Sequence, residues 1–168
     1  MAIETERKFL ILRPSDELLL SQTGSRKLDI IQTYLTPDGK TERRIRKITE
    51  GERVAYIYTE KRPISGTKSS RHEDERDISE EEYHALMNEC ITELTKTRFA
   101  FPFDGHIIEI DIYPPDIGGD GLYGYAVMEI ELTSEDEKFS LPEFIKIKEE
   151  LTGTGKFSNK AMAKPKRI

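Results

Sequence analysis

Short stretches in which apolar residues alternate with charged or polar ones recur along this chain, and they constrain its fold more than any other feature. A period of two is typical of a β-strand with unlike faces, because successive side chains point to opposite sides of a sheet. Turn-forming residues separate the stretches. The stretches cover residues 3–12, 29–35, 41–49, 53–61, 71–78, 94–101, 106–113 and 124–132. We therefore expect a mostly antiparallel sheet.

Three of the connections have the sequence of a tight hairpin turn, in which glycine supplies the positive φ that the turn requires. The dipeptides are Asp38-Gly39, Glu50-Gly51 and Asp104-Gly105. Eight strands in antiparallel succession suit a closed β-barrel.

Two segments combine a capping box with apolar residues at helical spacing. The box is formed by Ser79 and Glu82 in the first segment, and by Ser140 and Glu143 in the second. Two shorter segments are also compatible with helices. The predicted helices cover residues 14–21, 80–91, 140–151 and 158–163. Helices packed outside the barrel give an α+β fold.

The length and composition favour one folded domain over residues 1–168. Hydrophobic residues make up 36% of the chain and charged residues 35%, so the chain is charge-rich but too apolar for a disordered protein. The net charge of −6 argues against a nucleic-acid-binding role, which requires a broad basic surface. No apolar run approaches the length that spans a bilayer. We expect no nucleic-acid partner and no membrane association.

The single cysteine, Cys90, excludes a disulfide within the chain. Its position in the predicted helix 80–91 favours a buried structural thiol over a nucleophile. A reducing cytoplasm fits this cysteine usage.

The polar face of the predicted strands carries pairs of like charges two residues apart. These pairs are Glu4 and Glu6, Arg44 and Arg46, Glu73 and Glu75, Lys96 and Arg98, Glu109 and Asp111, and Glu129 and Glu131. An ordinary sandwich with this face in bulk water is one interpretation. Like charges repel, however, and the helices need the apolar face of the sheet to pack against. We therefore expect the charges to line the lumen of the barrel.

A lumen with both carboxylates and basic groups is costly if it is dry and empty. Carboxylate clusters suit Mg²⁺ or Mn²⁺, which retain water and bridge to phosphates. Arginine and lysine match phosphate oxygens. The two sets together predict a polyphosphate site.

Several motifs resemble, in order along the chain, those of the CYTH superfamily of triphosphate tunnel metalloenzymes. The first is the E-x-E-x-K signature, present here as E-T-E-R-K at 4–8. The others are Q-T-Y-L at 32–35, R-R-I-R at 43–46, T-E-K at 59–61, S-R-H-E-D-E at 70–75, K-T-R at 96–98, I-E-I-D at 108–111, M-E-I-E at 128–131 and K-F-S-N-K-A at 156–161. The likeness spans nearly the whole chain and is strongest to the short, single-domain bacterial members.

The resemblance implies an eight-stranded antiparallel tunnel that binds a triphosphate and cleaves it with Mg²⁺ or Mn²⁺, with a C-terminal helix as a plug at one end. The implied metal ligands are Glu4, Glu6, Glu129 and Glu131. The implied phosphate-binding residues are Lys8, Tyr34, Arg44, Arg46, Lys61, Lys96 and Arg98, with Lys156 and Lys160 near the plug helix. The implied catalytic residues, which position water or the basic groups, are Lys61, Glu73, Glu75, Glu109 and Asp111. A shifted register would replace Glu73 and Glu75 by Glu75 and Asp77.

The predicted function is metal-dependent hydrolysis of a triphosphate, with inorganic tripolyphosphate ahead of other substrates. Arg7 falls on the outer strand face and should be dispensable for chemistry. The alternatives are class IV adenylyl cyclase, thiamine triphosphatase, nucleoside triphosphatase and a non-catalytic triphosphate-binding module. A homodimer through a barrel end or an outer helix is compatible with the sequence.

Overall fold

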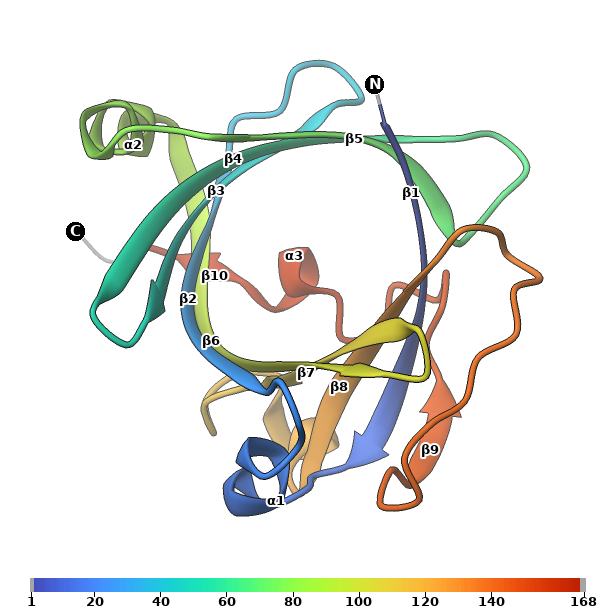
Figure 1. The fold of residues 1–168 in the computed structure, drawn as a ribbon. Coiled ribbons are helices and arrows are strands. Elements are labelled where there is room, and N and C mark those ends of the chain that lie inside the picture. Colours follow the sequence, from blue (N-terminus) through green and yellow to red (C-terminus); the bar gives the residue numbers. More distant parts are fainter. Residues whose placement is uncertain (1, 167–168) are drawn as a thin grey trace.

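The structure is a computed structural model that describes residues 2–166, in which eight strands form a closed antiparallel ring (Figure 1). The strands are β1 (Ala2–Leu12), β2 (Arg26–Leu35), β3 (Glu42–Glu50), β4 (Arg53–Pro63), β5 (Ser70–Asp77), β6 (Cys90–Phe103), β7 (His106–Ile112) and β8 (Tyr125–Leu132). Around the ring they follow the order β6-β2-β3-β4-β5-β1-β8-β7, and the pairing of β7 with β6 closes it. The predicted eight-stranded barrel and its three hairpins are confirmed.

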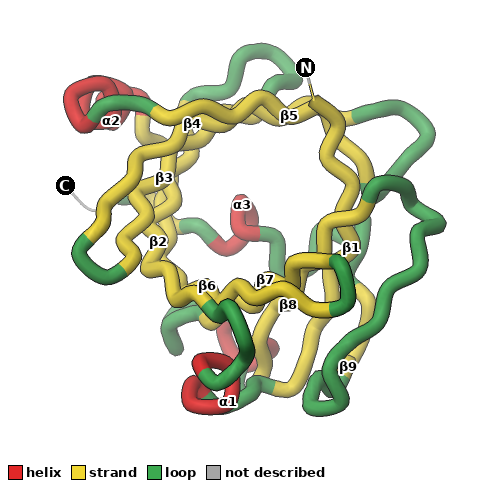
Figure 2. The backbone as a smooth tube through the Cα atoms, in the orientation of Figure 1, coloured by secondary structure: helices red, strands yellow, loops and turns green. Residues whose placement is uncertain are grey.

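Shorter elements surround or enter this ring (Figure 2). They are the helices α1 (Asp16–Leu20), α2 (Glu80–Leu86) and α3 (Asn159–Met162), the 3₁₀ turns η1 (Met87–Glu89) and η2 (Gly119–Leu122), and the strands β9 (Ile147–Glu150) and β10 (Lys164–Pro165). α1 and α2 lie outside the ring, whereas α3 lies within its outline when the barrel is viewed along its axis. α1 and α3 confirm the predictions for 14–21 and 158–163, and α2 confirms the first part of the prediction for 80–91, whose end forms η1 and the start of β6. Among residues 2–166, no helix has the length and apolar character needed to cross a bilayer.

The apolar half of the alternating pattern packs on the outside of the ring and forms the main core. On β7 and β8, Ile110 and Ile130 are fully buried and point away from the neighbouring carboxylates. Leu19 of α1 joins this core, and the segment between β8 and β9 covers it with aromatic and aliphatic side chains. Burial of apolar surface on this side stabilises the barrel and turns the charged face inward.

A smaller outer cluster lies beneath α2. Tyr83 of this helix is buried against Leu35, Ile45 and Tyr58 of three successive strands. The Ser79 side chain caps the helix by accepting a hydrogen bond from the Glu82 backbone N–H, as the capping box predicts.

The prediction of a helix over residues 140–151 is wrong. Phe139, Leu141, Phe144 and Ile145 pack on the outer core in an irregular chain, and the segment then enters β9. β9 pairs with residues 9–11 of β1. The strand β5 does not reach this part of β1, because the pairing of β5 with β1 ends at Thr5. Backbone groups left unpaired there would cost free energy, and β9 supplies their hydrogen bonds. This requirement outweighs the helical spacing of the apolar residues.

Cys90 also departs from the prediction. It is the first residue of β6 rather than a helical residue, and it is only half-buried. Burial, followed by the nearby Glu93 carboxylate, raises the pKa of its thiol. A raised pKa disfavours the nucleophilic thiolate, so the structure supports an unreactive role for this thiol.

Candidate active site

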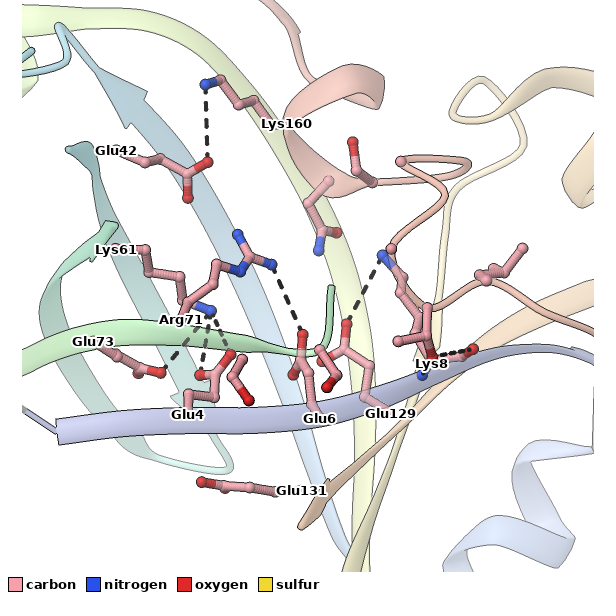
Figure 3. Close-up of a pocket in the computed structure, with 18 of the residues that line it drawn as sticks. Glu4, Glu6, Lys8, Glu42, Lys61, Arg71, Glu73, Glu129, Glu131 and Lys160 are labelled. Carbon is pink, nitrogen blue, oxygen red and sulfur yellow. Dashed lines mark hydrogen bonds and ion pairs between the residues drawn. The ribbon is translucent and has the colours of Figure 1, made fainter. Parts of the chain in front are cut away.

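The inner face of the barrel surrounds a polar cavity of about 560 Å³ (Figure 3). Nearly all of the predicted site residues line this cavity. They are Glu4, Glu6, Lys8, Tyr34, Arg44, Arg46, Lys61, Glu73, Glu75, Lys96, Arg98, Glu109, Glu129, Glu131, Lys156 and Lys160. The period-two pattern therefore brings charges from seven of the eight strands of the ring to one place, while β2 contributes the uncharged Gln32 and Tyr34. The interpretation of an outward-facing charged surface is excluded.

Asp111 is the predicted site residue that does not line the cavity. It is 1% exposed and lies behind two basic side chains of β6. Its carboxylate accepts hydrogen bonds from Lys96 Nζ at 2.7 Å and from Arg98 Nε and a terminal nitrogen at 2.7 and 2.9 Å. Burial opposes ionisation of this carboxyl, but the adjacent Arg98 and Lys96 hold its pKa below the usual range. Asp111 therefore orients the basic groups from behind the wall.

Arg98 is the centre of a buried ionic network. In addition to Asp111 it donates to Glu109 at 2.8 Å and lies 3.7 Å from Glu129. Burial alone would raise the pKa of Glu129, but Arg98 and Lys8 overcome this effect and lower it to about 2. The network pairs positively charged donors with negatively charged carboxylates through hydrogen bonds, which is the condition under which buried charges are tolerated.

Lys96 is almost completely buried in the same network. Burial has the largest effect on its pKa and lowers it. The Asp111 carboxylate acts in the opposite direction, and repulsion from Arg98 lowers the pKa further, so that the pKa is about 8. A lysine with a lowered pKa is poised to respond to an added negative charge, because an anion favours its protonated form.

The strands β1, β4 and β5 form an opposite wall around Lys61 (Figure 3). Lys61 Nζ donates to Glu4 at 3.0 Å and lies 4.0 Å from Glu73. Burial and the nearby Arg44 guanidinium lower the pKa of Lys61, while Glu4 acts in the opposite direction. The ammonium group thus links a predicted metal ligand to a predicted catalytic carboxylate.

The register of β5 resolves the choice between Glu73 and Asp77. Glu73 pairs with Lys61 and Glu75 with Thr59, and both glutamates line the cavity. Asp77 pairs with Ile57 at the end of the strand and is not among the lining residues. Glu73 and Glu75 are therefore the pair that faces the lumen.

Two arginines of β3 carry hydrogen-bonding capacity that the protein does not use. Arg46 donates to Glu75 at 2.9 Å, but the Nε atoms of both Arg44 and Arg46 are buried without a hydrogen-bond partner. Burial, followed by repulsion from Arg44, lowers the pKa of Arg46 to about 10. Buried donors without partners favour an added acceptor, and phosphate oxygens match guanidinium groups well.

Tyr34 lies beside these arginines on β2. Its hydroxyl accepts a hydrogen bond from Gln32 at 2.7 Å, and burial raises its pKa to about 12. Tyr34 therefore stays neutral, so it can offer a phosphate a hydrogen bond but no charge.

Glu6 and Glu131 stand directly opposite each other on β1 and β8. Burial, followed by repulsion from Glu129 and Glu4, raises the pKa of Glu6 to about 8. Burial and Glu4 also raise the pKa of Glu131, which has no ion pair or hydrogen bond within residues 2–166. This edge of the cavity therefore has more negative charge than the protein neutralises.

The excess of carboxylates fits a hard divalent cation such as Mg²⁺ or Mn²⁺. Glu4, Glu6, Glu129 and Glu131 supply only oxygen donors, which is the ligand type these ions prefer. Within the described chain, no three such residues already converge as a complete cluster. Mg²⁺ commonly binds through one or two carboxylates and completes its coordination with water and phosphate, so the donor set fits this mode.

Lys156 and Lys160 lie on the C-terminal segment, at the periphery of the cavity. Lys160 Nζ is 4.0 Å from Glu42 of β3, and the Lys156 ammonium pairs with Glu149. Both lysines are exposed, unlike Lys61 and Lys96 in the walls.

Sequence reasoning missed several residues of the cavity. Arg71 lines it and lies 4.0 Å from Glu6, and Glu42 lines it near the C-terminal segment. Each stands two residues before a predicted site residue, Arg71 before Glu73 and Glu42 before Arg44, so strand alternation could have found both. Ser158 and Asn159 also line the cavity, but no strand pattern points to them.

Arg7 lies on the outer face, as predicted. Its guanidinium pairs with Glu150 of β9 and stacks between Phe9 and Phe139. It is not among the residues that line the cavity.

Comparison with known proteins shows the same fold. The family model for the CYTH domain matches residues 2–164. No curated protein sequence matches the chain. Among solved structures, the inorganic triphosphatase NE1496 is 28% identical over 95% of this chain and 97% of its own, with a TM-score of 0.54.

Two further structures share the architecture at lower identity. PH1819 from Pyrococcus horikoshii is 23% identical, with 79% of this chain and 80% of its own covered and a TM-score of 0.58. HpAC1 from Hippeastrum, a putative adenylyl cyclase described as having a dominant triphosphatase activity, is 17% identical over 80% of each chain, with a TM-score of 0.53. At this identity the likeness concerns the fold alone.

Proposed function

This chain belongs to the CYTH domain family, and from that membership we propose that it is a divalent-metal-dependent triphosphatase that hydrolyses inorganic tripolyphosphate. The similarity to the inorganic triphosphatase NE1496 over nearly the full length of both chains supports the reaction class. The proposal goes further than this similarity when it names tripolyphosphate as the substrate and Mg²⁺ or Mn²⁺ as the cofactor.

One observation carries the proposal: a single cavity holds an under-neutralised carboxylate edge and buried arginines with unused donors. Glu6 and Glu131 form the carboxylate edge, and Arg44 and Arg46 carry the unused donors. A linear triphosphate with a bound divalent cation has matching groups of both signs. Neither a metal ion alone nor an anion alone would satisfy both parts of the site.

In this reaction, water adds to a terminal phosphorus, the bridging P–O bond breaks, and orthophosphate and pyrophosphate leave. When bound, the divalent cation neutralises charge on the phosphate oxygens. Glu4, Glu6, Glu129 and Glu131 would hold it. Little covalent chemistry is required of the protein, whose contribution is positioning and charge stabilisation.

The basic side chains bind the phosphates and stabilise the charge that develops on the leaving pyrophosphate. Lys8, Lys61 and Lys96 act as point charges, and the guanidinium groups of Arg44, Arg46 and Arg98 offer directed donors. Asp111 fixes two of these groups by its three short hydrogen bonds.

A carboxylate of the Glu73, Glu75 and Glu109 set orients the attacking water and accepts its proton. Burial raises the pKa of Glu109, which makes this carboxylate a stronger base than an exposed glutamate. Glu75 is tied to Arg46 and Thr59, and Glu73 lies near Lys61. Substitution of each carboxylate in turn identifies the base.

The cavity lining favours an inorganic substrate over a nucleotide. Among the described residues that line it, Tyr34 is the one aromatic side chain, and it is buried against Gln32. An adenine or thiazolium ring gains most from an exposed aromatic face, which this lining does not offer. Hydrolysis of ATP or thiamine triphosphate and cyclisation of ATP are thus the less favoured activities.

The test is phosphate release from tripolyphosphate, ATP and thiamine triphosphate with Mg²⁺ or Mn²⁺. We expect tripolyphosphate to be the preferred substrate. The Glu4→Gln, Glu6→Gln double variant should lose roughly 10²-fold or more in kcat, because electrostatic groups at the reacting phosphate commonly contribute that much. Arg7→Gln is the matched control, since Arg7 lies on the same strand but on the outer face.

Three results would contradict the proposal. Equal activity in the double variant would remove the metal assignment. Formation of cyclic AMP from ATP as the main product would indicate a cyclase. Tight tripolyphosphate binding without turnover under all metal conditions would indicate a binding module.

A further inference from the structure

Tyr113 stands at the end of β7, across from Lys96 of β6. It comes two residues after Asp111, so the alternation of the strand directs its side chain to the same inner face. The register that pairs Arg98 with Asp111 places Tyr113 opposite Lys96 two residues farther along. Pro114 follows at once and cannot continue the ladder of hydrogen bonds. The Tyr113 hydroxyl is therefore held beside a lysine that is expected to bind phosphate.

The side-chain amide of Asn159 bridges Tyr113 and Lys96. Asn159 is the first residue of α3, which Ser158 caps by accepting a hydrogen bond from the Ala161 N–H at 3.1 Å. Its Oδ1 atom accepts hydrogen bonds from the Tyr113 hydroxyl at 2.5 Å and from Lys96 Nζ at 3.4 Å. The cap and the two hydrogen bonds fix the amide between β7 and β6.

The chemistry of the two donors decides which end of this amide faces them. A lysine ammonium has three N–H donors and no acceptor, so the amide atom beside Lys96 must be the oxygen. Burial, followed by the Asp111 and Glu129 carboxylates, raises the pKa of Tyr113, so its hydroxyl keeps the proton that it donates. The NH2 group of Asn159 must then point away from both donors.

This NH2 group has two donors that the protein does not use. Within residues 2–166 neither N–H of the Asn159 amide donates to a protein acceptor, and the nitrogen is not sealed from solvent. Asn159 lines the same cavity as Lys96. An accessible donor pair among groups that are expected to bind phosphate suits an anionic oxygen, because hydrogen bonds to charged groups are the stronger ones.

Lys96 offers one further donor to the same ligand. Its ammonium donates to Asp111 at 2.7 Å and to Asn159, which leaves one of its three N–H groups for the cavity. The residue is only 4% exposed, so the ammonium has little freedom to turn. The remaining lysine N–H and the asparagine NH2 group are therefore both available to one phosphate.

We propose that Asn159 is a substrate-binding residue, whose NH2 group donates a hydrogen bond to a phosphate oxygen, and that the Tyr113 hydroxyl is a positioning group that holds the amide in this orientation. The inference rests on the proposed function and deepens it, because it adds a neutral, directed donor to the charged phosphate ligands. Without the hydroxyl, only the longer hydrogen bond from Lys96 holds the amide oxygen. The amide can then rotate and turn its oxygen toward the phosphate, which the oxygen repels.

The first test is the affinity of Asn159 variants for tripolyphosphate, measured by isothermal titration calorimetry with a chelator so that no turnover is needed. Asn159→Ala should raise Kd roughly tenfold, as expected for loss of a hydrogen bond to a charged group. Asn159→Asp keeps an oxygen for Tyr113 and Lys96 but replaces the NH2 group with a second oxygen. It should keep the wild-type Tm and bind more weakly than Asn159→Ala.

A purely structural role for Asn159 predicts the reverse order, because aspartate restores the two contacts that alanine loses. Wild-type affinity in Asn159→Ala, or recovered affinity in Asn159→Asp, would overturn the proposal. Asn88→Ala is the matched control, since Asn88 is exposed in η1, and its Kd should equal that of the wild type.

The second test concerns Tyr113→Phe, which removes the hydroxyl and keeps the ring. Kd and KM for tripolyphosphate should rise roughly threefold, and kcat should change less, because the amide binds the ground state and the transition state alike. In the Asn159→Ala background, Tyr113→Phe should cost no further affinity, since the group it positions is gone. Additive losses in the double variant would overturn the positioning role of Tyr113.

Tyr123→Phe makes the same chemical change at a residue that is 87% exposed, and it should leave Kd and KM unchanged. Thermal unfolding followed by circular dichroism reports the folding of each variant. The expected losses of affinity without hydrolysis of any triphosphate would contradict the proposed function but not the role of Asn159. Hydrolysis of tripolyphosphate with unchanged Kd in both Asn159 variants would contradict this inference alone.

Discussion

Replacing Glu6 with glutamine should remove much of the pH dependence of stability in the metal-free protein. The pKa of Glu6 is raised to about 8 by burial, then by repulsion from Glu129 and Glu4. An unfolded chain has the ordinary glutamate pKa, so between about pH 4.5 and 8 the folded state binds the proton that the unfolded state has released. Stability is therefore full at low pH and is lost as the pH rises through this window.

The expected size follows from the width of the window. One proton retained by the folded state changes the free energy of unfolding by about 1.4 kcal/mol per pH unit. Because Glu6 shares its electrostatic field with Glu4 and Glu129, part of the effect remains in the neighbours when Glu6 is replaced. Between pH 5 and 8 the wild type should lose roughly 2 to 4 kcal/mol more than Glu6→Gln. This corresponds to roughly 4 to 16 °C in Tm for a chain of this size.

Thermal unfolding in the presence of a chelator, at half-unit steps from pH 5 to 8, measures this difference. Glu52→Gln is the matched control, because Glu52 is exposed in the turn between β3 and β4 and lies away from the cavity. Added Mn²⁺ should restore the stability of the wild type at pH 8 by binding the ionised carboxylates, with little effect on Glu6→Gln. Parallel pH profiles of the wild type and Glu6→Gln would refute the reasoning about burial and repulsion.

Two further substitutions test the wall behind the cavity and the outer face. Asp111→Ala leaves Lys96 and Arg98 without their buried partner, so it should destabilise the protein by about 3 to 5 kcal/mol and lower Tm by roughly 6 to 20 °C. A Tm change of a degree or less in differential scanning calorimetry would show that the network does not depend on this carboxylate. Arg7→Gln removes a surface ion pair and should cost about 1 kcal/mol or less while kcat stays at the wild-type value. A large fall in kcat would place Arg7 in the chemistry, against its outward position.

The helical prediction for 140–151 shows where local patterns fail. Apolar residues at helical spacing also suit an irregular chain that places each side chain on a nearby surface. The deciding factor lies far away in sequence, since β1 has unpaired backbone beyond the reach of β5 and β9 supplies the partners. A sequence pattern does not record which strand edge remains open.

Asp111 shows the same limit within the site. Strand alternation correctly places it on the inner face of β7, two residues from Glu109, yet only Glu109 reaches the cavity. The long side chains of Lys96 and Arg98 on the neighbouring strand cover Asp111. The length and direction of neighbouring side chains, which depend on the register between strands, decide which carboxylate meets a substrate.

The sequence by itself determined the barrel and the sign of its lining, because strand alternation and hairpin turns are local properties and like charges on one face need partners. The E-T-E-R-K stretch, for example, already placed Glu4, Glu6 and Lys8 on one face and Arg7 on the other. Tertiary structure alone decided which charges neutralise each other and which residues of the C-terminal segment reach the lumen. Those features depend on contacts between strands and the C-terminal segment, whose residues are far apart along the chain.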